Sequence, residues 1–292
     1  MSPPRDPPSG DPPPGTAPRR DGPHRPRPFA AKGRPAPGRR GPGGPRPPGP
    51  AAREGVDHVV LYGWHPVSQA LANAGRRLHR LLATENAVIR LREEVGELRI
   101  APELVRPSAI GALLGADAVH QGLYLEADPL PAPDLDALPD DALLLAFDQI
   151  TDPHNVGAIV RTAAAFGVTA IVTTARHSPN ATGVMAKSAS GGLEHVPLVV
   201  VRNLAEALIA LGERGFSRIG LDSEAETVLD AVAPRRPAVI VLGAEGKGLR
   251  QRTRECCDVL ARIDFAGEIR SLNVSNAAAI TLYALTRGGG DA

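Results

Sequence analysis

From residue 142 onward, short runs of continuous apolar residues alternate with segments of helical periodicity. The apolar runs predict strands at 142–147, 169–174, 196–201, 217–222, 238–243 and 258–263. Helical patterns fall between most of these runs, at 155–166, 182–189, 203–214 and around 248–255, and a last one covers 274–286. Strands that are apolar on both faces are typical of a parallel sheet covered by helices on both sides. The sequence therefore predicts an α/β domain over residues 142–288.

A second, smaller α/β pattern precedes this domain, over residues 55–127. Its expected strands are 58–63, 78–84 and 121–127, and its expected helices are 65–75, 86–96 and 107–115. Asn86 is the expected N-cap of the middle helix, and Gly75 is the expected stop of the first. Between the two patterns, residues 128–141 contain four prolines and five aspartates, which indicate a solvated linker.

Residues 1–52 differ in composition from the rest of the chain. The first fifty residues contain eighteen prolines and nine glycines, so we expect this tail to be disordered. They also carry ten Lys or Arg against three Asp, in a chain whose net charge is only +1. Such a basic tail suggests a polyanionic partner. A solubilising or merely tolerated extension explains the same composition equally well.

Cysteine usage argues against both a disulfide framework and a metal cluster. Cys256 and Cys257 are adjacent and cannot close a loop with one another, and the chain has no CxxC pair or Cys/His metal spacing. We therefore expect no metal and a reducing, cytoplasmic location. No apolar run reaches the roughly 18 residues of a membrane span, and the N-terminus lacks the apolar core of a secretory signal. We expect no membrane association.

Ligands of open parallel sheets bind beyond the carboxyl ends of strands, which directs attention to the loops after the first, fifth and sixth predicted strands. The first loop reads DPHN and leads into a helix. Asp152 or Asn155 can cap this helix, Gly157 allows a close backbone approach, and Arg161 lies one turn inside. A helix N-terminus beside an arginine is a ready anion site. Taken alone, these residues favour a plain cap and an arginine that reaches the surface.

The second loop, LGAEGKGLR, surrounds charged residues with glycines. Gly243, Gly246 and Gly248 flank Glu245 and can present backbone groups to a ligand. The loop fits neither a Walker A motif nor the GxGxxG spacing of a dinucleotide site. A tight strand-to-helix turn is the alternative, although a phosphate cradle would not favour the carboxylate of Glu245.

The third loop places four hydrogen-bonding side chains before a run of small residues. These side chains are Ser271, Asn273, Ser275 and Asn276. A helix cap explains some of them, but one cap does not need four such groups. The small residues at 277–279 permit close packing against another helix, including one from a second subunit.

Together and in this order, the three loops resemble the signatures of the SpoU (TrmH-type) ribose 2′-O-methyltransferases of the SPOUT class. The matching elements are the N-x-G-x-x-x-R helix start, the G-x-E-G-x-G loop and the S-L-N-V-S segment. The resemblance covers residues 142–286. Residues 57–127, ending in HQGLYLEA, resemble the small RNA-binding domain of RlmB-like members, which modify a guanosine of large-subunit ribosomal RNA.

This resemblance implies an α/β knot, a helix-covered parallel sheet whose C-terminal segment threads a loop to form a trefoil. It also implies S-adenosyl-L-methionine as the methyl donor, in a site lined by Gly243, Ile263 and Leu272. Apolar Ile263 and Leu272 suit the face of an adenine, and ordinary core packing is their alternative interpretation. The resemblance further implies a homodimer whose active site lies at the subunit interface. An arginine of one subunit can then reach the cofactor pocket of the other, so Arg161 needs no partner nearby in its own sequence.

The implied reaction methylates a ribose 2′-hydroxyl, a very weak acid, and requires neither a metal nor a covalent intermediate. The family assigns the proton acceptor role to the arginine that matches Arg161. Because arginine is normally always charged, Arg161 can instead bind the adjacent phosphate and stabilise developing alkoxide charge. The resemblance implies that Asn155, Ser271 and Asn273 orient the ribose and the arginine. It implies that Glu245 holds Arg161 or contacts the substrate.

The sequence thus predicts a methyltransferase that uses S-adenosylmethionine and acts on a guanosine of 23S rRNA. Three alternatives stay open: a transfer-RNA ribose methyltransferase, a non-catalytic RNA-binding or ribosome-assembly protein of the same fold, and a nucleotide-binding α/β enzyme unrelated to RNA. The separate segment at 57–127 favours ribosomal RNA over transfer RNA. The absence of Walker A and Rossmann loops argues against the last alternative.

Overall fold

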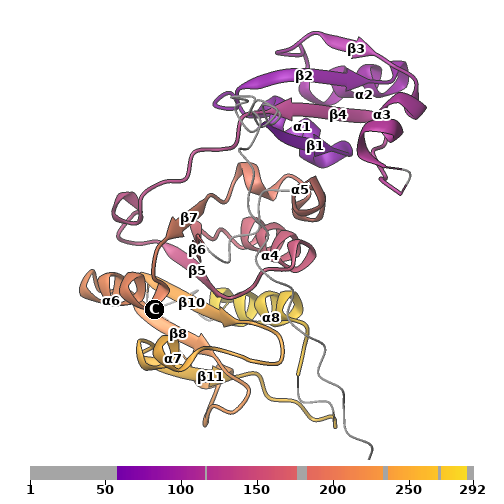
Figure 1. Ribbon diagram of the computed structural model, residues 1–292. Coiled ribbons are helices and arrows are strands. Elements are labelled where there is room, and N and C mark those ends of the chain that lie inside the picture. Colours follow the sequence, from indigo (N-terminus) through magenta and orange to yellow (C-terminus); the bar gives the residue numbers. More distant parts are fainter. Residues whose placement is uncertain (1–57, 116, 176–182, 233–235, 269–270, 288–292) are drawn as a thin grey trace, which may run out of the picture. The chain divides into compact units, whose positions relative to one another are not determined.

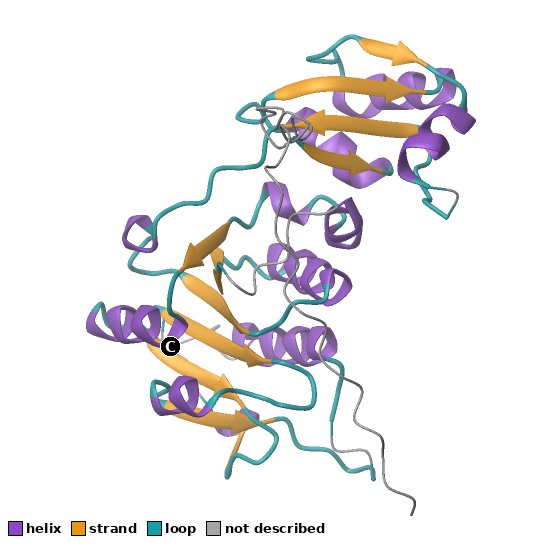
Figure 2. Ribbon diagram, viewed as in Figure 1, coloured by secondary structure: helices purple, strands orange, loops and turns teal. Residues whose placement is uncertain are grey.

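The computed structural model describes residues 58–115, 117–175, 183–232, 236–268 and 271–287. Within these residues the chain forms two β-sheets (Figures 1 and 2). The predicted basic tail lies outside the described residues. In the part of the chain that the structure describes, no helix has the length and apolar character needed to cross a membrane.

The first sheet has four strands in the order β1-β4-β2-β3. The strands are β1 (Val59–Tyr62), β2 (Leu78–Ala83), β3 (Pro102–Leu104) and β4 (Leu123–Ala127). The helices are α1 (Trp64–Ala72), α2 (Glu85–Val95) and α3 (Pro107–Leu114). Strand β4 is antiparallel to β1 and β2, whereas β3 is parallel to β2. Successive residues of β2 face opposite sides, so that Leu81 packs with α1 and α2 while Leu82 packs against Ile110 of α3.

Three details of this sheet differ from the sequence prediction. Thr84, not Asn86, is the N-cap of helix α2, and Asn86 lies inside the first turn. Helix α1 ends at Ala72 instead of near Gly75, because the Asn73 side chain accepts a hydrogen bond from the Gly75 N–H (3.0 Å) and closes a turn. Strand β3 has no counterpart among the predicted strands. It has only three residues, begins with proline and lies at the sheet edge, where apolar periodicity is weak.

The second sheet has seven strands in the order β7-β6-β5-β10-β8-β11-β9, and all neighbouring strands are parallel. The strands are β5 (Leu143–Asp148), β6 (Ala170–Thr174), β7 (Leu198–Val201), β8 (Ser217–Leu221), β9 (Thr227–Val228), β10 (Ala238–Gly243) and β11 (Val259–Arg262). The helices are α4 (Pro153–Ala165), α5 (Gly183–Ala189), α6 (Leu204–Glu213), α7 (Gln251–Glu255) and α8 (Val274–Arg287). The predicted α/β class is confirmed, and β9 is the one strand of this sheet without a predicted counterpart among the described residues.

Apolar side chains cover both faces of the second sheet, because its central strands are apolar throughout. Leu143, Leu145 and Phe147 of β5 pack with α4, α5 and α8 on one face. Leu144 and Ala146 pack with α6 and the segment around α7 on the other. This layering is the one expected for a buried parallel sheet.

The strand order reverses between β5 and β10. From β5 the chain continues outward through β6 and β7 on one side, whereas β10 and β8 lie on the other side (Figure 1). Loops that leave neighbouring strands in opposite directions open a crevice at their carboxyl ends, where ligands of such sheets bind. The first and second predicted loops leave the sheet at this point.

The predicted linker, residues 128–141, is held against the second sheet rather than fully solvated. It contains a short 3-10 helix, η1 (Leu135–Ala137), and Leu138 is buried. The Arg214 guanidinium donates hydrogen bonds to the carbonyl oxygens of Leu135 (2.9 Å) and Leu138 (2.6 Å) and pairs with Asp140. The linker therefore has a defined path over the end of α6.

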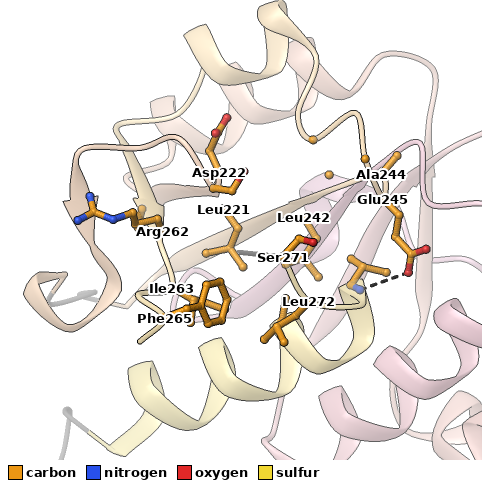
Figure 3. A pocket seen from close by; sticks show the side chains of 17 residues that line it. Leu221, Asp222, Leu242, Ala244, Glu245, Arg262, Ile263, Phe265, Ser271 and Leu272 are labelled. Atoms are coloured by element: carbon orange, nitrogen blue, oxygen red, sulfur yellow. Dashed lines mark hydrogen bonds between the residues drawn. The ribbon is translucent and has the colours of Figure 1, made fainter. Parts of the chain in front are cut away.

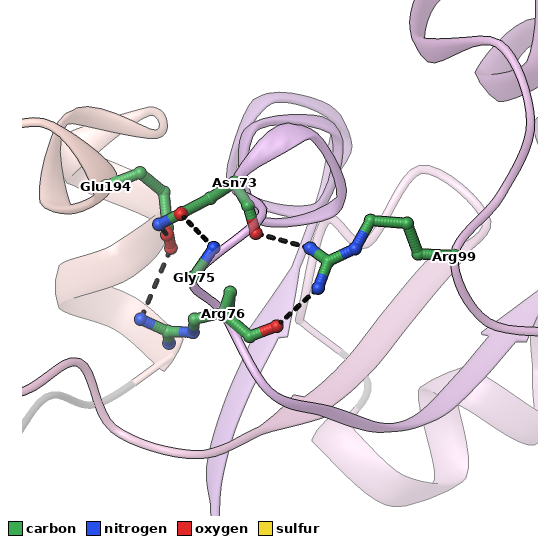
Figure 4. A network of polar contacts seen from close by, with 5 residues as sticks. All are labelled: Asn73, Gly75, Arg76, Arg99 and Glu194. Atoms are coloured by element: carbon green, nitrogen blue, oxygen red, sulfur yellow. Dashed lines mark hydrogen bonds and ion pairs between the residues drawn. The ribbon is translucent and has the colours of Figure 1, made fainter.

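A buried polar network follows helix α1 (Figure 4). The Arg76 and Glu194 side chains are 5% and 4% exposed and form an ion pair of 3.4 Å, and Asn73 Nδ2 donates to Glu194 Oε2 at 2.6 Å. Glu194 belongs to a 3-10 helix, η2 (Gly192–Glu194). Burial lowers the pKa of Arg76, and the Glu194 carboxylate partly offsets that shift. The Arg99 guanidinium caps the backbone carbonyls of Asn73 and Arg76.

Candidate active site

Helix α4 starts in the first loop because two strong signals coincide there. The Asp152 side chain accepts a hydrogen bond from the His154 N–H (3.0 Å), and Pro153 occupies the first helical turn. Of the two predicted caps, Asp152 is therefore the one used. The amide of Asn155 is left available for contacts beyond its own helix.

Asn155 makes those contacts with residues of the other two loops. Asn155 Nδ2 donates to Glu245 Oε1 at 3.0 Å, and Asn273 Nδ2 donates to the same oxygen at 2.8 Å. Asn273 Nδ2 also lies 2.9 Å from Asn155 Oδ1. Asn273 is held in turn by the Ser275 N–H, which donates to its Oδ1 at 2.9 Å. Three predicted site residues, separated widely in sequence, thus meet at one carboxylate.

The second loop folds into a tight turn whose two backbone arms are in contact. A Cβ at position 243 would lie 2.3 Å from the carbonyl carbon of Gly248, and the Gly248 N–H donates to the Ala244 carbonyl at 2.9 Å. Gly246 and Gly248 have φ angles of 74° and 63°, which favour glycine. The tight-turn alternative is therefore correct as geometry, and the same turn places Glu245 in the network.

An ion pair anchors the end of this turn to strand β5. Asp148 is fully buried at the end of β5, and it accepts hydrogen bonds from the Arg250 N–H (2.8 Å) and from Arg250 Nε (2.6 Å). A carboxylate with no exposed surface requires such a partner. Neither residue was among the predicted site residues, although an acid that ends an apolar run was a visible signal.

Gly157 permits a close approach, but of a helix rather than of a ligand. A Cβ at this position would lie 2.5 Å from the Ser188 Cβ and 2.6 Å from the Met185 carbonyl oxygen. Both residues belong to α5, so Gly157 allows α4 and α5 to pack closely.

A cavity of about 390 Å³ opens beside the network, between the carboxyl ends of β8, β10 and β11 and the start of α8 (Figure 3). Its lining includes all three predicted cofactor residues, Gly243, Ile263 and Leu272, together with Glu245 and Ser271. The structure thus brings the predicted cofactor residues into one pocket.

The walls of this cavity differ in chemistry. Ile263 and Phe265 form an apolar end, and the Glu245 carboxylate lies at the opposite end (Figure 3). Leu272 is 38% exposed, so core packing does not explain its position, whereas Ile263 also packs against the main core. Asp222, which was not predicted, lines the cavity and pairs with Arg254 at 2.8 Å.

A second hollow also borders Glu245. It is lined by the first loop and by the second: Gln149, Ile150, Thr151, Asp152, Asn155, Ala244, Glu245 and Lys247. Glu245 therefore borders two spaces, one whose lining is mainly apolar and one with Asn155 and Lys247 at its edge.

Arg161 does not line either space. It lies on α4 six residues beyond Asn155, a rise of about 9 Å along the helix. Its side chain is exposed, and η2 packs against its backbone, since a Cβ at Gly192 would lie 3.2 Å from the Arg161 Cα. Among the described residues of one chain, the donors to Glu245 Oε1 are Asn155, Asn273 and Val274, and Arg161 of the same chain is not one of them.

Comparison with known proteins agrees with this fold. The SpoU rRNA Methylase family model matches residues 142–283, and a model described as RNA 2′-O ribose methyltransferase substrate binding matches residues 60–133. The 23S rRNA (guanosine-2′-O-)-methyltransferase RlmB of Pseudomonas aeruginosa is 42% identical over 179 residues, which are 59% of this chain and 72% of the relative. The RlmB of Xylella fastidiosa is 40% identical over 228 residues, 76% of this chain and 88% of the relative.

A solved structure gives the same result. The SpoU methyltransferase AviRb from Streptomyces viridochromogenes, crystallised with the cofactor AdoMet, superposes with a TM-score of 0.67 at 25% identity, covering 79% of this chain and 89% of AviRb. The chain belongs to the SpoU rRNA methylase family. It is an RNA ribose 2′-O-methyltransferase with a substrate-binding segment ahead of the methylase segment.

Proposed function

We propose that this enzyme transfers the methyl group of S-adenosylmethionine to the 2′-hydroxyl of a guanosine in 23S rRNA. The observation that carries the proposal is the meeting of Asn155, Glu245 and Asn273, from three loops, beside a cavity of about 390 Å³. The names of the relatives from Pseudomonas aeruginosa and Xylella fastidiosa support 23S rRNA as the substrate. The division into an RNA-binding segment at 55–127, a linker at 128–141 and a methyl-transfer domain at 142–288 belongs to the same proposal, as does a cytoplasmic location.

The cavity fits S-adenosylmethionine in the chemistry of its walls. Ile263, Phe265 and Leu272 offer apolar surface to an adenine ring, and the turn at Gly243 leaves room for backbone groups only. We assign Gly243, Ile263 and Leu272 to the binding of this cofactor. When bound, the cofactor supplies an electrophilic methyl group on its sulfonium.

The ribose is proposed to approach from the second hollow, which Glu245 also borders. Asn155 and Lys247 border that hollow, so an amide and a cation are available to a sugar and its phosphate. Asn273 holds Asn155 and Glu245 in place through its amide. Ser271 lines the cavity close to this network and can donate a hydrogen bond to the ribose. These residues orient the hydroxyl, which is the contribution of positioning to the rate.

Arg161 is proposed to act on the site of a second subunit in a homodimer. Its distance along α4 from Asn155 and its absence from both lining sets support that assignment. Two large apolar residues of α8, Ile280 and Tyr283, are 42% and 51% exposed, as expected for a helix that packs against another copy. In that place Arg161 binds the phosphate next to the ribose and stabilises the charge that develops on the hydroxyl oxygen. Acceptance of the hydroxyl proton by Arg161 is the alternative role.

Mapping of ribose methylation in RNA from a strain that lacks this protein tests the substrate. We expect one guanosine of 23S rRNA to lose its 2′-O-methyl group and to regain it when the gene is restored. Loss of a methyl group from transfer RNA instead would favour the transfer-RNA alternative. No change in any RNA, together with no heat of S-adenosylmethionine binding in calorimetry, would favour a non-catalytic RNA-binding protein.

A further inference from the structure

We infer that the first sheet contains a zinc-binding site formed by His58, His79 and Asp128. His58 lies directly before β1, His79 lies on β2, and Asp128 lies directly after β4. Each offers one ligand atom, and these atoms all lie within 4.8 Å of one another. The site lies apart from the cavity and the Glu245 network, and methyl transfer makes no use of it.

The distances suit a tetrahedral ion. Asp128 Oδ1 lies 3.3 Å from His58 Nδ1 and 2.6 Å from His79 Nε2. Zinc bonds of about 2.0–2.2 Å at tetrahedral angles place neighbouring ligand atoms about 3.3 Å apart. The first distance already has this value, and the second needs to open by less than about 1 Å.

A β-bulge aims His79 at this point. Strand β2 pairs with β4 through Leu78 with Ala127 and through Arg80 with Glu126, so His79 is the extra residue between two pairs. Bulges of this kind redirect a side chain, and they are frequent next to functional sites. On the other side of β4, Val59 pairs with Ala127, which places His58 and Asp128 at the next register position.

The cluster contains more imidazole groups than a single hydrogen bond to the Asp128 carboxylate requires. One imidazole is enough to satisfy Asp128, yet two are present, with ring centroids 3.9 Å apart. Two imidazole nitrogens and a carboxylate oxygen are the ligands that zinc accepts, with a fourth position left for water. The side chains of His58, His79 and Asp128 are 35%, 25% and 27% exposed, so an ion from solution can enter. Arg77, the nearby cation, faces the other carboxylate oxygen at 3.9 Å and is itself 78% exposed.

The site would tie together the points where the chain enters and leaves the first sheet. His58 precedes β1, the first strand of the sheet, and Asp128 follows β4, where the chain leaves for the second sheet. Short sequence motifs for metal sites do not detect these ligands. His58 and His79 are 21 residues apart, His79 and Asp128 are 49 residues apart, and only strand pairing brings them together.

Calorimetric titration of the metal-stripped full-length chain with ZnCl₂ tests the inference. We expect one zinc ion per chain at micromolar affinity or better and a higher melting temperature in its presence. His79→Gln and Asp128→Asn should each weaken binding by about tenfold or more. His65→Gln is the matched control, because this histidine lies exposed on α1 away from the cluster, and its zinc affinity should equal that of the unmodified chain.

The His58→Gln variant distinguishes the loss of a zinc ligand from misfolding. It leaves the hydrogen bond between His79 and Asp128 intact, so its circular dichroism spectrum should be unchanged while its zinc affinity falls. Cobalt(II) gives a second readout, since a tetrahedral site produces visible absorption that these variants should lose. Absence of zinc binding by the unmodified chain would overturn the inference, as would equal zinc affinity of the His58→Gln, His79→Gln and Asp128→Asn variants and the unmodified chain.

Discussion

At position 243 the chain has no room for a side chain. The obstructing atoms are backbone atoms of Gly248 and Leu249, 2.3–2.6 Å from the place where a Cβ would stand, and they cannot move without opening the turn. The same turn places Glu245 in contact with Asn155 and Asn273. Because Gly243 has no side chain, the turn can close, and the closed turn keeps both the cavity wall and the Glu245 network in place.

Gly243→Ala should therefore impair the site more than the fold. Overpacking of this kind typically costs about 1–3 kcal/mol of stability, and we expect S-adenosylmethionine affinity to fall by about tenfold or more as the turn opens. Denaturant unfolding and calorimetric titration measure the two effects. Gly267→Ala is the matched control, because a Cβ there meets open space and φ is ordinary. Equal cofactor affinity in both variants would show that the turn does not shape the site.

Arg161 is exposed and far along α4, so its removal should leave the cavity intact. We expect Arg161→Ala to lower methyl transfer by about 10²-fold or more, the usual effect of losing a group that stabilises developing charge, while S-adenosylmethionine still binds. Single-turnover methylation and calorimetry separate the two. Arg252→Ala removes an exposed arginine of α7 and should keep full activity. Normal turnover of Arg161→Ala would remove this residue from the site.

At the scale of elements, the short helix η2 takes part both in a buried ion pair and in packing against helix α4. Its Glu194 accepts from Asn73 and pairs with Arg76 in a setting that is almost completely buried, and its Gly192 packs on the backbone of Arg161. A buried charge without its partner is far more costly than an exposed one. The pair is therefore a structural link between the end of α1 and the helix that presents Arg161.

Glu194→Gln should lower the free energy of unfolding by about 3–5 kcal/mol, because Arg76 would stay buried without a counter-charge. Urea denaturation measures the change. Glu255→Gln breaks an exposed pair with Arg252, whose side chains are 49% and 69% exposed, and should cost less than about 1 kcal/mol. Replacing both Arg76 and Glu194 by leucine should recover part of the loss. The interpretation fails if Glu194→Gln is no more destabilising than Glu255→Gln.

At the scale of the whole molecule, the proposed dimer predicts that two inactive variants can restore activity when their subunits combine. If Arg161 serves the partner's cavity, a mixed dimer of an Arg161→Ala subunit and a Gly243→Val subunit should contain one intact site. Each variant alone should be inactive, whereas co-expressed and co-purified mixed dimers should recover up to about half of the normal rate. Methyltransferase assays on differently tagged mixtures measure this. Mixed dimers as inactive as their parents would place Arg161 in its own subunit's site.

Much of the fold could be predicted from apolar periodicity alone. The six long strands of the second sheet and its helices lie where continuous apolar runs and helical patterns indicated. The three-residue strand β3 and the two-residue strand β9 could not be predicted, because segments that short have no period. Local hydrogen bonds decided the ends of elements, as at Thr84 and Asn73, where several residues were equally good candidates.

The residue types of the site were visible in the sequence, but their partners were not. Asn155, Glu245 and Asn273 were identified through the family resemblance, and the structure adds that one carboxylate oxygen holds both amides. Asp148 and Arg250 could not be paired from the sequence, because they lie 102 residues apart.

The sequence by itself determined which segments become strands and helices and which loops contain reactive side chains, because these depend on neighbours within a few residues. Only the tertiary structure decided which side chains meet. The order and register of the strands bring Asn155 to Glu245, Arg76 to Glu194, and His58 to His79 and Asp128. The free energy of such contacts comes from burial and from pairing between distant residues, and no local period encodes it.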